Sequence, residues 1–267
     1  MRPAVSSGRN IRRSDARLIC YGNTDVGKKR KNNQDYFLIA TEKKYFSAVV
    51  CDGMGGAAGG NVASKLACEV YQETLNASLR DTDPSAMLRE DLVKVLRLAV
   101  VCANKAVYSR AQTDNDCYGM GTTLVAFFSC KGRNAAVNVG DSRMYSFTGG
   151  MGIQITKDHS LVQMLIDNGA LSEREAVHHP KKNIILRALG VDDMVEPDMF
   201  FDIQYDYLLL CTDGLSNFVS RREMEDIIYM QSRWKPVTAE KKVKMLIEIA
   251  NKKGGNDNIT AVLIGKE

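Results

Sequence analysis

The chain has 267 residues, of which 45% are hydrophobic and 25% charged, and its formal net charge is +4. This composition is ordinary for a globular protein, and no apolar stretch approaches the roughly 20 residues that cross a bilayer. The mild positive charge does not by itself indicate that the protein binds nucleic acid. We expect a protein that binds neither a membrane nor nucleic acid, and we expect it to be a monomer.

Residues 1–16 carry four arginines but no apolar periodicity. An arginine-rich, acid-poor segment is also the composition of an organelle transit peptide, but Pro3 and Gly8 would interrupt an amphipathic helix. We therefore predict a mobile basic tail over residues 1–16 and a single domain over residues 17–267.

The apolar pattern that follows predicts clusters of strands separated by helices. The expected strands begin at Leu18 and then cover residues 35–41, 45–51, 122–129, 133–139, 143–147, 196–203, 207–211 and 258–264. The expected helices cover residues 62–79, 92–107, 221–229 and 237–252. Strand clusters, rather than strict strand–helix alternation, predict an α+β fold in which antiparallel sheets pack on each other and helices lie outside.

Two helical segments carry further expectations. In the first helix, Val62, Leu66, Val70 and Leu79 lie on one apolar stripe. A polar, helical insert spans about residues 158–183, and Asp158 or Ser160 is expected to cap its first helix.

Seven cysteines are scattered along the chain without a C-x-x-C pair. An odd number of unpaired cysteines, several in predicted core elements, indicates a reducing compartment, so we expect a cytoplasmic protein. The three histidines, His159, His178 and His179, lack the spacing of a zinc motif. We interpret His178 and His179 as surface residues.

Four short motifs place an aspartate beside a glycine or asparagine, next to a predicted strand. They are Cys51-Asp52-Gly53-Met54-Gly55-Gly56, Val139-Gly140-Asp141-Ser142-Arg143, Cys211-Thr212-Asp213-Gly214 and Gly255-Asn256-Asp257-Asn258-Ile259-Thr260. A single Asp-Gly pair is usually a turn, because glycine tolerates positive φ and aspartate caps backbone amides. Four such motifs together indicate carboxylates gathered to bind a hard cation such as Mg²⁺ or Mn²⁺.

The segment from Gly53 to Ala58 also fits the dinucleotide fingerprint G-x-G-x-x-G/A, with Glu73 about 20 residues further on. In that alternative, Asp52 would lie beside a pyrophosphate that it repels, and the following elements would not continue a βαβ unit. The metal interpretation is favoured because it also accounts for the other three motifs.

Two more segments complete the pattern. Arg30-Lys31-Asn32-Asn33-Gln34-Asp35 precedes a strand, and Gly121-Thr122-Thr123-Leu124 lies between the first and second Asp motifs. With all of these in order, the chain from about residue 17 to residue 265 resembles the metal-dependent serine/threonine protein phosphatases of type 2C, in their short bacterial form. The resemblance implies a four-layer α/β/β/α sandwich, with two antiparallel sheets flanked by helix pairs and a binuclear metal centre in a cleft at one edge.

The resemblance also implies roles for individual residues. Asp52 would bridge two metal ions, and the carbonyl of Gly53 would bind the second of them. Asp213 and Asp257 would complete the first metal site, and Asp141 with Asp213 would match a third. The cofactors implied are therefore two Mn²⁺ or Mg²⁺ ions per chain, with a possible third.

Arg30 would bind the substrate phosphate, and Asp35 would orient metal-bound water. Two bridged dications lower the pKa of a shared water, so that hydroxide attacks phosphorus directly and no phosphoenzyme forms. The lysines around Arg30 resemble a nuclear-localisation patch or a solvated basic turn, but we interpret them as attracting phosphorylated substrate. The expected activity is hydrolysis of Ser/Thr phosphate monoesters in phosphorylated proteins, which would reverse a Ser/Thr kinase in bacterial signalling and act on that kinase and its targets.

Two positions depart from the family pattern. Met54 replaces a histidine of many eukaryotic members, and Gln34 replaces a glutamate of many relatives. They motivate an alternative, a catalytically weak pseudo-phosphatase that binds phosphoproteins. A phosphatase dedicated to one small regulatory partner is a further possibility, and the insert over residues 158–183, which matches the flap of the family, would carry that selectivity.

Overall fold

The computed structural model describes residues 18–55, 59–231 and 236–266, so the predicted tail over residues 1–16 lies outside the described residues. Within them the strands form two sheets, and the paired strands run antiparallel. The first sheet has the order β1 (Leu18–Asp25), β11 (Ile259–Lys266), β10 (Tyr207–Cys211), β7 (Arg143–Thr148) and β8 (Met151–Gln154). The second has the order β2 (Asp35–Thr41), β3 (Phe46–Met54), β5 (Leu124–Cys130), β6 (Arg133–Val139) and β9 (Asp198–Phe201), and β4 (Gly121–Thr122) pairs with the end of β3.

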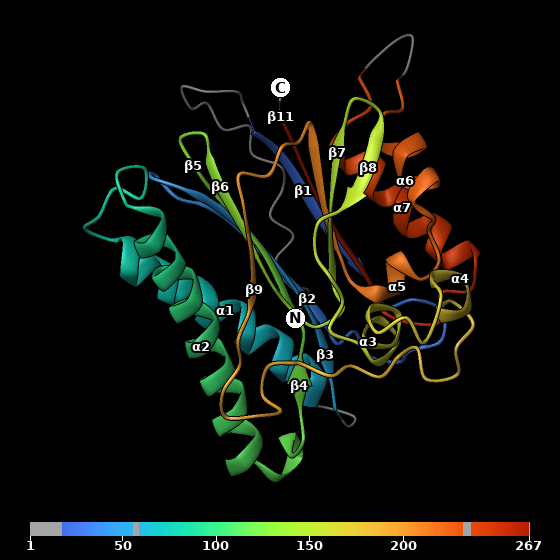
Figure 1. The fold of residues 1–267 in the computed structure, drawn as a ribbon, viewed down its shortest axis with the longest axis horizontal. Coiled ribbons are helices and arrows are strands. Elements are labelled where there is room, and N and C mark those ends of the chain that lie inside the picture. Colours follow the sequence, from blue (N-terminus) through green and yellow to red (C-terminus); the bar gives the residue numbers. More distant parts are fainter. Residues whose placement is uncertain (1–17, 56–58, 232–235, 267) are drawn as a thin grey trace.

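Helix pairs cover the outer faces of both sheets, as Figure 1 shows. The helices α1 (Gly59–Leu79) and α2 (Arg89–Thr113) lie on the second sheet, and α6 (Arg221–Ile228) and α7 (Ala239–Lys252) lie on the first. This arrangement confirms the predicted α/β/β/α sandwich. Among the described residues, none of the helices has the length and apolar character needed to span a membrane.

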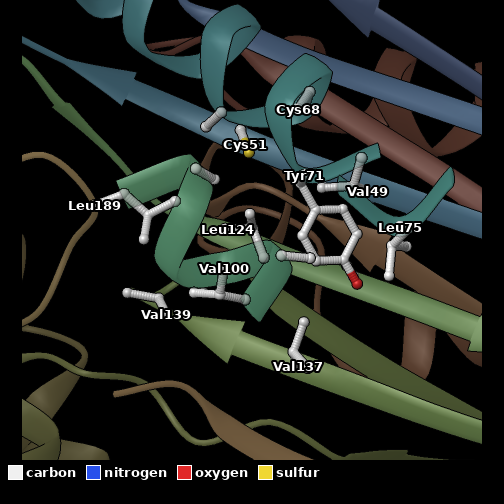
Figure 2. Packing of buried hydrophobic residues seen from close by; sticks show 14 of the residues in the cluster. Val49, Cys51, Cys68, Tyr71, Leu75, Val100, Leu124, Val137, Val139 and Leu189 are labelled. Atoms are coloured by element: carbon white, nitrogen blue, oxygen red, sulfur yellow. The ribbon is translucent and has the colours of Figure 1, made fainter. Parts of the chain in front are cut away.

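Three hydrophobic clusters hold the layers together. The inner faces of the sheets meet through residues such as Phe127, Leu208 and Val262. Beneath α1 and α2, Tyr71 and Leu75 gather with the side chains of β3, β5 and β6 (Figure 2). A third cluster lies between the first sheet and the helices α6 and α7.

The first helix differs from the expected pattern. Leu79 is buried, but Val62, Leu66 and Val70 pack only partly buried at the side of the cluster. The face against the sheet instead carries a mixture of small and large residues, Ala63, Ala67, Cys68, Tyr71 and Leu75. Small side chains there allow the helix to lie close to the sheet, and Val62, Leu66 and Val70 lie at its flank.

The short elements were not expected from the sequence. They are η1 (Asn115–Cys117), β8 and α5 (Asp213–Ser216), and the strand predicted over residues 122–129 is interrupted at Thr123. The insert contains two short helices, α3 (Leu161–Asp167) and α4 (Glu173–Ala176). Ser160 caps α3 by accepting a hydrogen bond from the backbone of Gln163. Asp158 does not cap this helix, because its carboxylate pairs with the guanidinium of Arg143.

Candidate metal centre

A cavity of about 550 Å³ lies at the edge of the sandwich where strand ends of both sheets meet. Its wall contains every residue predicted to bind metal or phosphate, while Asp35 lies behind it. The lining residues are Arg30, Gln34, Asp52, Gly53, Met54, Gly55, Asp141, Asn183, Ile185, Asp213, Asp257 and Asn258. The cavity therefore brings together residues that are far apart in sequence, such as Arg30 and Asp257, which are separated by 227 positions.

Asp52 lies near the end of β3, and the Gly-Thr-Thr segment fixes its backbone. Its N–H donates to the hydroxyl of Thr123 at 2.9 Å, and its carbonyl accepts from the hydroxyl of Thr122 at 2.9 Å. Burial and the neighbouring carboxylates, that of Asp35 first, raise the pKa of Asp52 well above its ordinary value. The charged form of Asp52 is therefore costly unless a cation lies beside it.

Asp141 and Asp213 each present a carboxylate oxygen without a partner. The Oδ1 atoms of both side chains are buried, and neither accepts a hydrogen bond from any described residue. Burial, followed by repulsion from Asp213, raises the pKa of Asp141 to about 7. Burial, followed by repulsion from Asp257, also raises the pKa of Asp213. Unpartnered buried oxygens of this kind are suited to a hard cation.

The glycines of the Asp-Gly motifs are required for close packing rather than for a turn. Neither Gly53 nor Gly214 has a positive φ. A Cβ at Gly53 would lie 1.9 Å from the carbonyl oxygen of Gly60, and one at Gly214 would lie 1.9 Å from that of Asn258. The turn interpretation is therefore wrong for these two motifs, because the glycines allow backbone segments to meet beside Asp52 and Asp213.

Arg30 reaches into the cavity and pairs with a predicted metal ligand. Its Nη2 donates to Oδ2 of Asp257 at 2.9 Å, and the two side chains are 51% and 34% exposed. This contact, followed by the charge of Asp257, raises the pKa of the guanidinium. Because the pair is largely exposed, Arg30 can exchange the carboxylate for a phosphate at little cost.

Asp35 is buried behind the cavity and joins the two sheets. Its Oδ2 accepts hydrogen bonds from the hydroxyls of Thr212 at 2.8 Å and Thr260 at 2.7 Å. It lies directly opposite Asp52 in the register of β2 and β3. Burial raises the pKa of Asp35 to about 7, although the two hydroxyls act in the opposite direction.

The two departures from the family pattern both line the cavity. The side-chain amide of Gln34 donates to the carbonyl of Gly55 at 3.2 Å, so its nitrogen is directed to the backbone of the loop after β3. Met54 contributes a thioether to the wall, and a thioether cannot donate a proton. The dinucleotide alternative is excluded because β3 pairs antiparallel with β2, β4 and β5 rather than within a parallel βαβ unit.

Three lining residues lay outside the expected set. Asn258 accepts from the backbone of Gln34 at 2.8 Å and donates to the carbonyls of Val26 and Asn32, so it holds the loop that carries Arg30. The wall also includes Asn183, at the expected end of the insert, and Ile185, two residues beyond that end. The place of Asn258 inside the last Asp motif was the only local signal for any of them. His178 is exposed, in agreement with its expected place at the surface.

The donor set fits a hard divalent cation. Among the described residues no three carboxylate, thiolate or imidazole side chains already surround one point at ligand distance. The fit rests instead on the all-oxygen donors, on the two orphaned oxygens of Asp141 and Asp213, and on the raised carboxyl pKa values. A dication in the cavity would offset both causes of the raised pKa values, the burial of the carboxyl groups first and their mutual repulsion second.

The double sheet, its helix pairs and the acidic cavity at one edge together define an α/β/β/α-sandwich phosphatase. The family described as Protein phosphatase 2C matches residues 26–251. The chain therefore belongs to the protein phosphatase 2C family, which confirms the family and the enzyme class predicted from the sequence, a protein-serine/threonine phosphatase.

Named relatives and solved structures agree with this family. Serine/threonine phosphatase stp of Listeria innocua is 39% identical over 245 residues, which cover 90% of this chain and 93% of that protein. The structure of Stp1 from Staphylococcus aureus, a serine/threonine phosphatase, gives a TM-score of 0.83 at 32% identity and covers 98% of this chain and 99% of that one. A structure of the catalytic domain of serine threonine protein phosphatase PstP in complex with 2 manganese ions gives 0.73 at 33% identity, over 93% of this chain and 97% of that one.

Proposed function

We propose that this chain hydrolyses phosphoserine and phosphothreonine in proteins, with two Mn²⁺ or Mg²⁺ ions bound in the acidic cavity. The observation that carries the proposal is the group of four aspartates around one cavity, two of them with buried, unpartnered oxygens. Membership of the protein phosphatase 2C family and the manganese-bound relative support it.

The aspartates would divide the ions between them. Asp52, at the centre of the strand ends, would bind both ions, and the carbonyl of Gly53 would bind one. Asp213 and Asp257 would bind the other, and Asp141 with Asp213 would hold a third ion. When bound, such ions lower the pKa of water and so supply a hydroxide nucleophile near neutral pH.

The remaining groups would orient the substrate. Arg30 would leave Asp257 and donate two parallel hydrogen bonds to the phosphate oxygens. Asp35, fixed by Thr212 and Thr260, would hold Asp52 and the strand ends in place across the two sheets. Since no side-chain nucleophile is required, the phosphoryl group would pass directly to water.

The physiological setting is also part of the proposal. We infer a monomeric catalytic domain over residues 17–267 that reverses a Ser/Thr kinase in the bacterial cytoplasm. The segment over residues 158–183 would act as its flap, because Asn183 reaches the cavity wall.

Hydrolysis of p-nitrophenyl phosphate and of a phosphothreonine peptide, titrated with Mn²⁺, tests the function. Chelation should abolish turnover, and Mn²⁺ should restore it. Asp213→Asn should remove both metal affinity, measured by calorimetry, and activity. Asp81→Asn is the matched control, since that exposed residue follows the end of α1 remote from the cavity.

Turnover after complete metal removal would contradict the mechanism. Phosphopeptide binding without hydrolysis at any Mn²⁺ concentration would instead support the pseudo-phosphatase alternative.

A further inference from the structure

Two basic segments without acidic residues border the cavity. Residues 26–34 contain three lysines and Arg30, and residues 177–187 contain Lys181, Lys182 and Arg187. Each segment also contributes to the cavity wall, the first through Arg30 and Gln34 and the second through Asn183 and Ile185. Their positive charges therefore lie at the rim of a site that takes an anionic group.

The backbone fixes the first segment against the last Asp motif. The N–H groups of Lys28 and Lys29 donate to the carbonyl of Gly255 at 2.7 and 3.2 Å. The side chain of Asn258 bonds the carbonyls of Val26 and Asn32 at 2.9 and 3.0 Å. The lysines are thus held beside Asp257 rather than on a free loop.

The second segment is held by hydrogen bonds to the start of the insert. The N–H of Leu161 donates to Ile184 at 2.9 Å, and the N–H of Leu186 donates to His159 at 2.7 Å. In this extended segment, successive side chains point in alternate directions. Asn183 and Ile185 contribute to the cavity wall, whereas Ile184 and Leu186 are exposed to solvent. Lys181 and Lys182 immediately precede the first wall residue.

The rim lysines have no salt-bridge partner among the described residues. Arg30 pairs with Asp257 and Arg187 pairs with Asp198. The exposed lysines make no ion pair with any described acidic residue; they are Lys28, Lys29, Lys31, Lys181 and Lys182. A phosphate seated at the cavity leaves these charges free to meet the rest of the substrate.

We propose that this phosphatase prefers phosphorylated sites flanked by further anionic groups, either acidic side chains or additional phosphates. The inference rests on the proposed function. An extended peptide advances about 3.3–3.6 Å per residue, so residues two or three positions from the phosphorylated one reach the rim. Anionic flanks would meet the unpaired lysines of the two segments.

The preference should be moderate and sensitive to salt. Exposed ion pairs are individually weak, but several pairs together should give about a tenfold preference in kcat/KM at low ionic strength. Screening shortens the range of these interactions, so about 0.5 M salt should largely remove the preference.

Three phosphothreonine peptides of equal length test the inference with the full chain and Mn²⁺. Their flanks are neutral, acidic or phosphoserine-containing, and kcat/KM is compared at low and high salt. We expect both anionic peptides to exceed the neutral one by about tenfold at low salt. A response to only one anionic flank would limit the preference to that chemical source.

Charge reversal identifies the residues responsible. Lys181→Glu/Lys182→Glu should reduce the ratio between acidic and neutral peptides to about one or below. Lys43→Glu/Lys241→Glu is the control, because it makes the same change in net charge away from the cavity. Asp35, at the start of β2, lies beside the cavity, whereas Lys43 comes just after the other end of that strand. Lys241 lies in the first turn of α7, whose other end approaches Gly255. This control should keep the wild-type ratio.

Equal kcat/KM values for the three peptides in the wild type would overturn this inference but not the proposed function. The same would follow if the control variant lost as much of the preference as Lys181→Glu/Lys182→Glu. No hydrolysis of the peptides or of p-nitrophenyl phosphate would overturn the proposed function, and the inference with it.

Discussion

Replacing Asp158 by alanine should destabilise the fold by about 3–5 kcal/mol, because it leaves a partly buried guanidinium without its carboxylate. Arg143 is the last residue of the second Asp motif, and its Nε donates to both oxygens of Asp158 at 2.9 and 3.1 Å. Its Nη2 donates to Oδ2 at 2.6 Å, and the side chains are only 27% and 9% exposed. The pair therefore joins β7 to the start of the insert in a largely desolvated position.

The structure limits how the charge could be compensated. After Asp158→Ala, the contact that remains for Arg143 is the hydroxyl of Tyr145 at 3.2 Å. A loss of about 3–5 kcal/mol corresponds to a fall in melting temperature of about 6–20 °C for a chain of this size. Arg143→Met/Asp158→Leu should recover most of the loss, since it removes both charges and keeps the volume.

Urea denaturation of Arg143→Met, Asp158→Leu and the double variant that combines them gives the coupling energy directly. Lys157→Ala is a control, because its pair with Asp167 is exposed on both sides and should matter far less. A cost for Asp158→Ala as small as that of the control would refute the reasoning, because the pair would then be solvated.

The other predictions concern the cavity and the insert. Asp213→Asn should lower turnover by about 10³-fold or more while the fold survives, as circular dichroism and phosphopeptide assays would show; near-normal turnover would mean that this carboxylate does not hold metal. Arg30→Ala should chiefly raise KM for phosphopeptides, by about tenfold or more, and a loss confined to kcat would assign Arg30 to the transition state instead. Asp141→Ala should remove one of three anomalous manganese peaks in crystals, and equal peak counts would leave this residue a structural role. Burial lowers the pKa of His159, so the folded chain binds fewer protons there than the unfolded chain; the contribution of His159 to stability should fall as pH drops through about 6.5, and the difference between the wild type and His159→Asn in denaturant titrations should show it.

The layered fold could be predicted because its signals are local and repeated. Apolar runs such as those of β3, β5 and β10 are long enough to distinguish strands from helices, and turn residues separate them. The elements that escaped prediction are η1, with three residues, α5, with four, and β8, with four of which two are exposed. So short an element shows too little of its period to be recognised in the sequence.

The cavity could be predicted in its residue types but not in its contacts. The four Asp motifs and the order of the segments gave the acidic lining. The pairing of Arg30 with Asp257 and the clamp made by Asn258 join residues more than 220 positions apart. Asp158 illustrates the same limit, since its local pattern predicted a helix cap and a distant arginine took its carboxylate. Local sequence cannot rank such competing partners.

The position of Asp35 shows why the cavity is a functional site rather than a packing accident. Like charges directly opposite each other on paired strands are destabilising, and Asp35 lies opposite Asp52. Thr212 and Thr260 of the first sheet nevertheless hold the Asp35 carboxylate in place from the other side of the sandwich. The hydrogen bonds from the hydroxyls of Thr212 and Thr260 favour the charged form of Asp35, although that charge lies next to other carboxylates. Crowded, buried carboxylates of this kind are costly without a cation beside them, so the position of Asp35 supports the proposed metal centre.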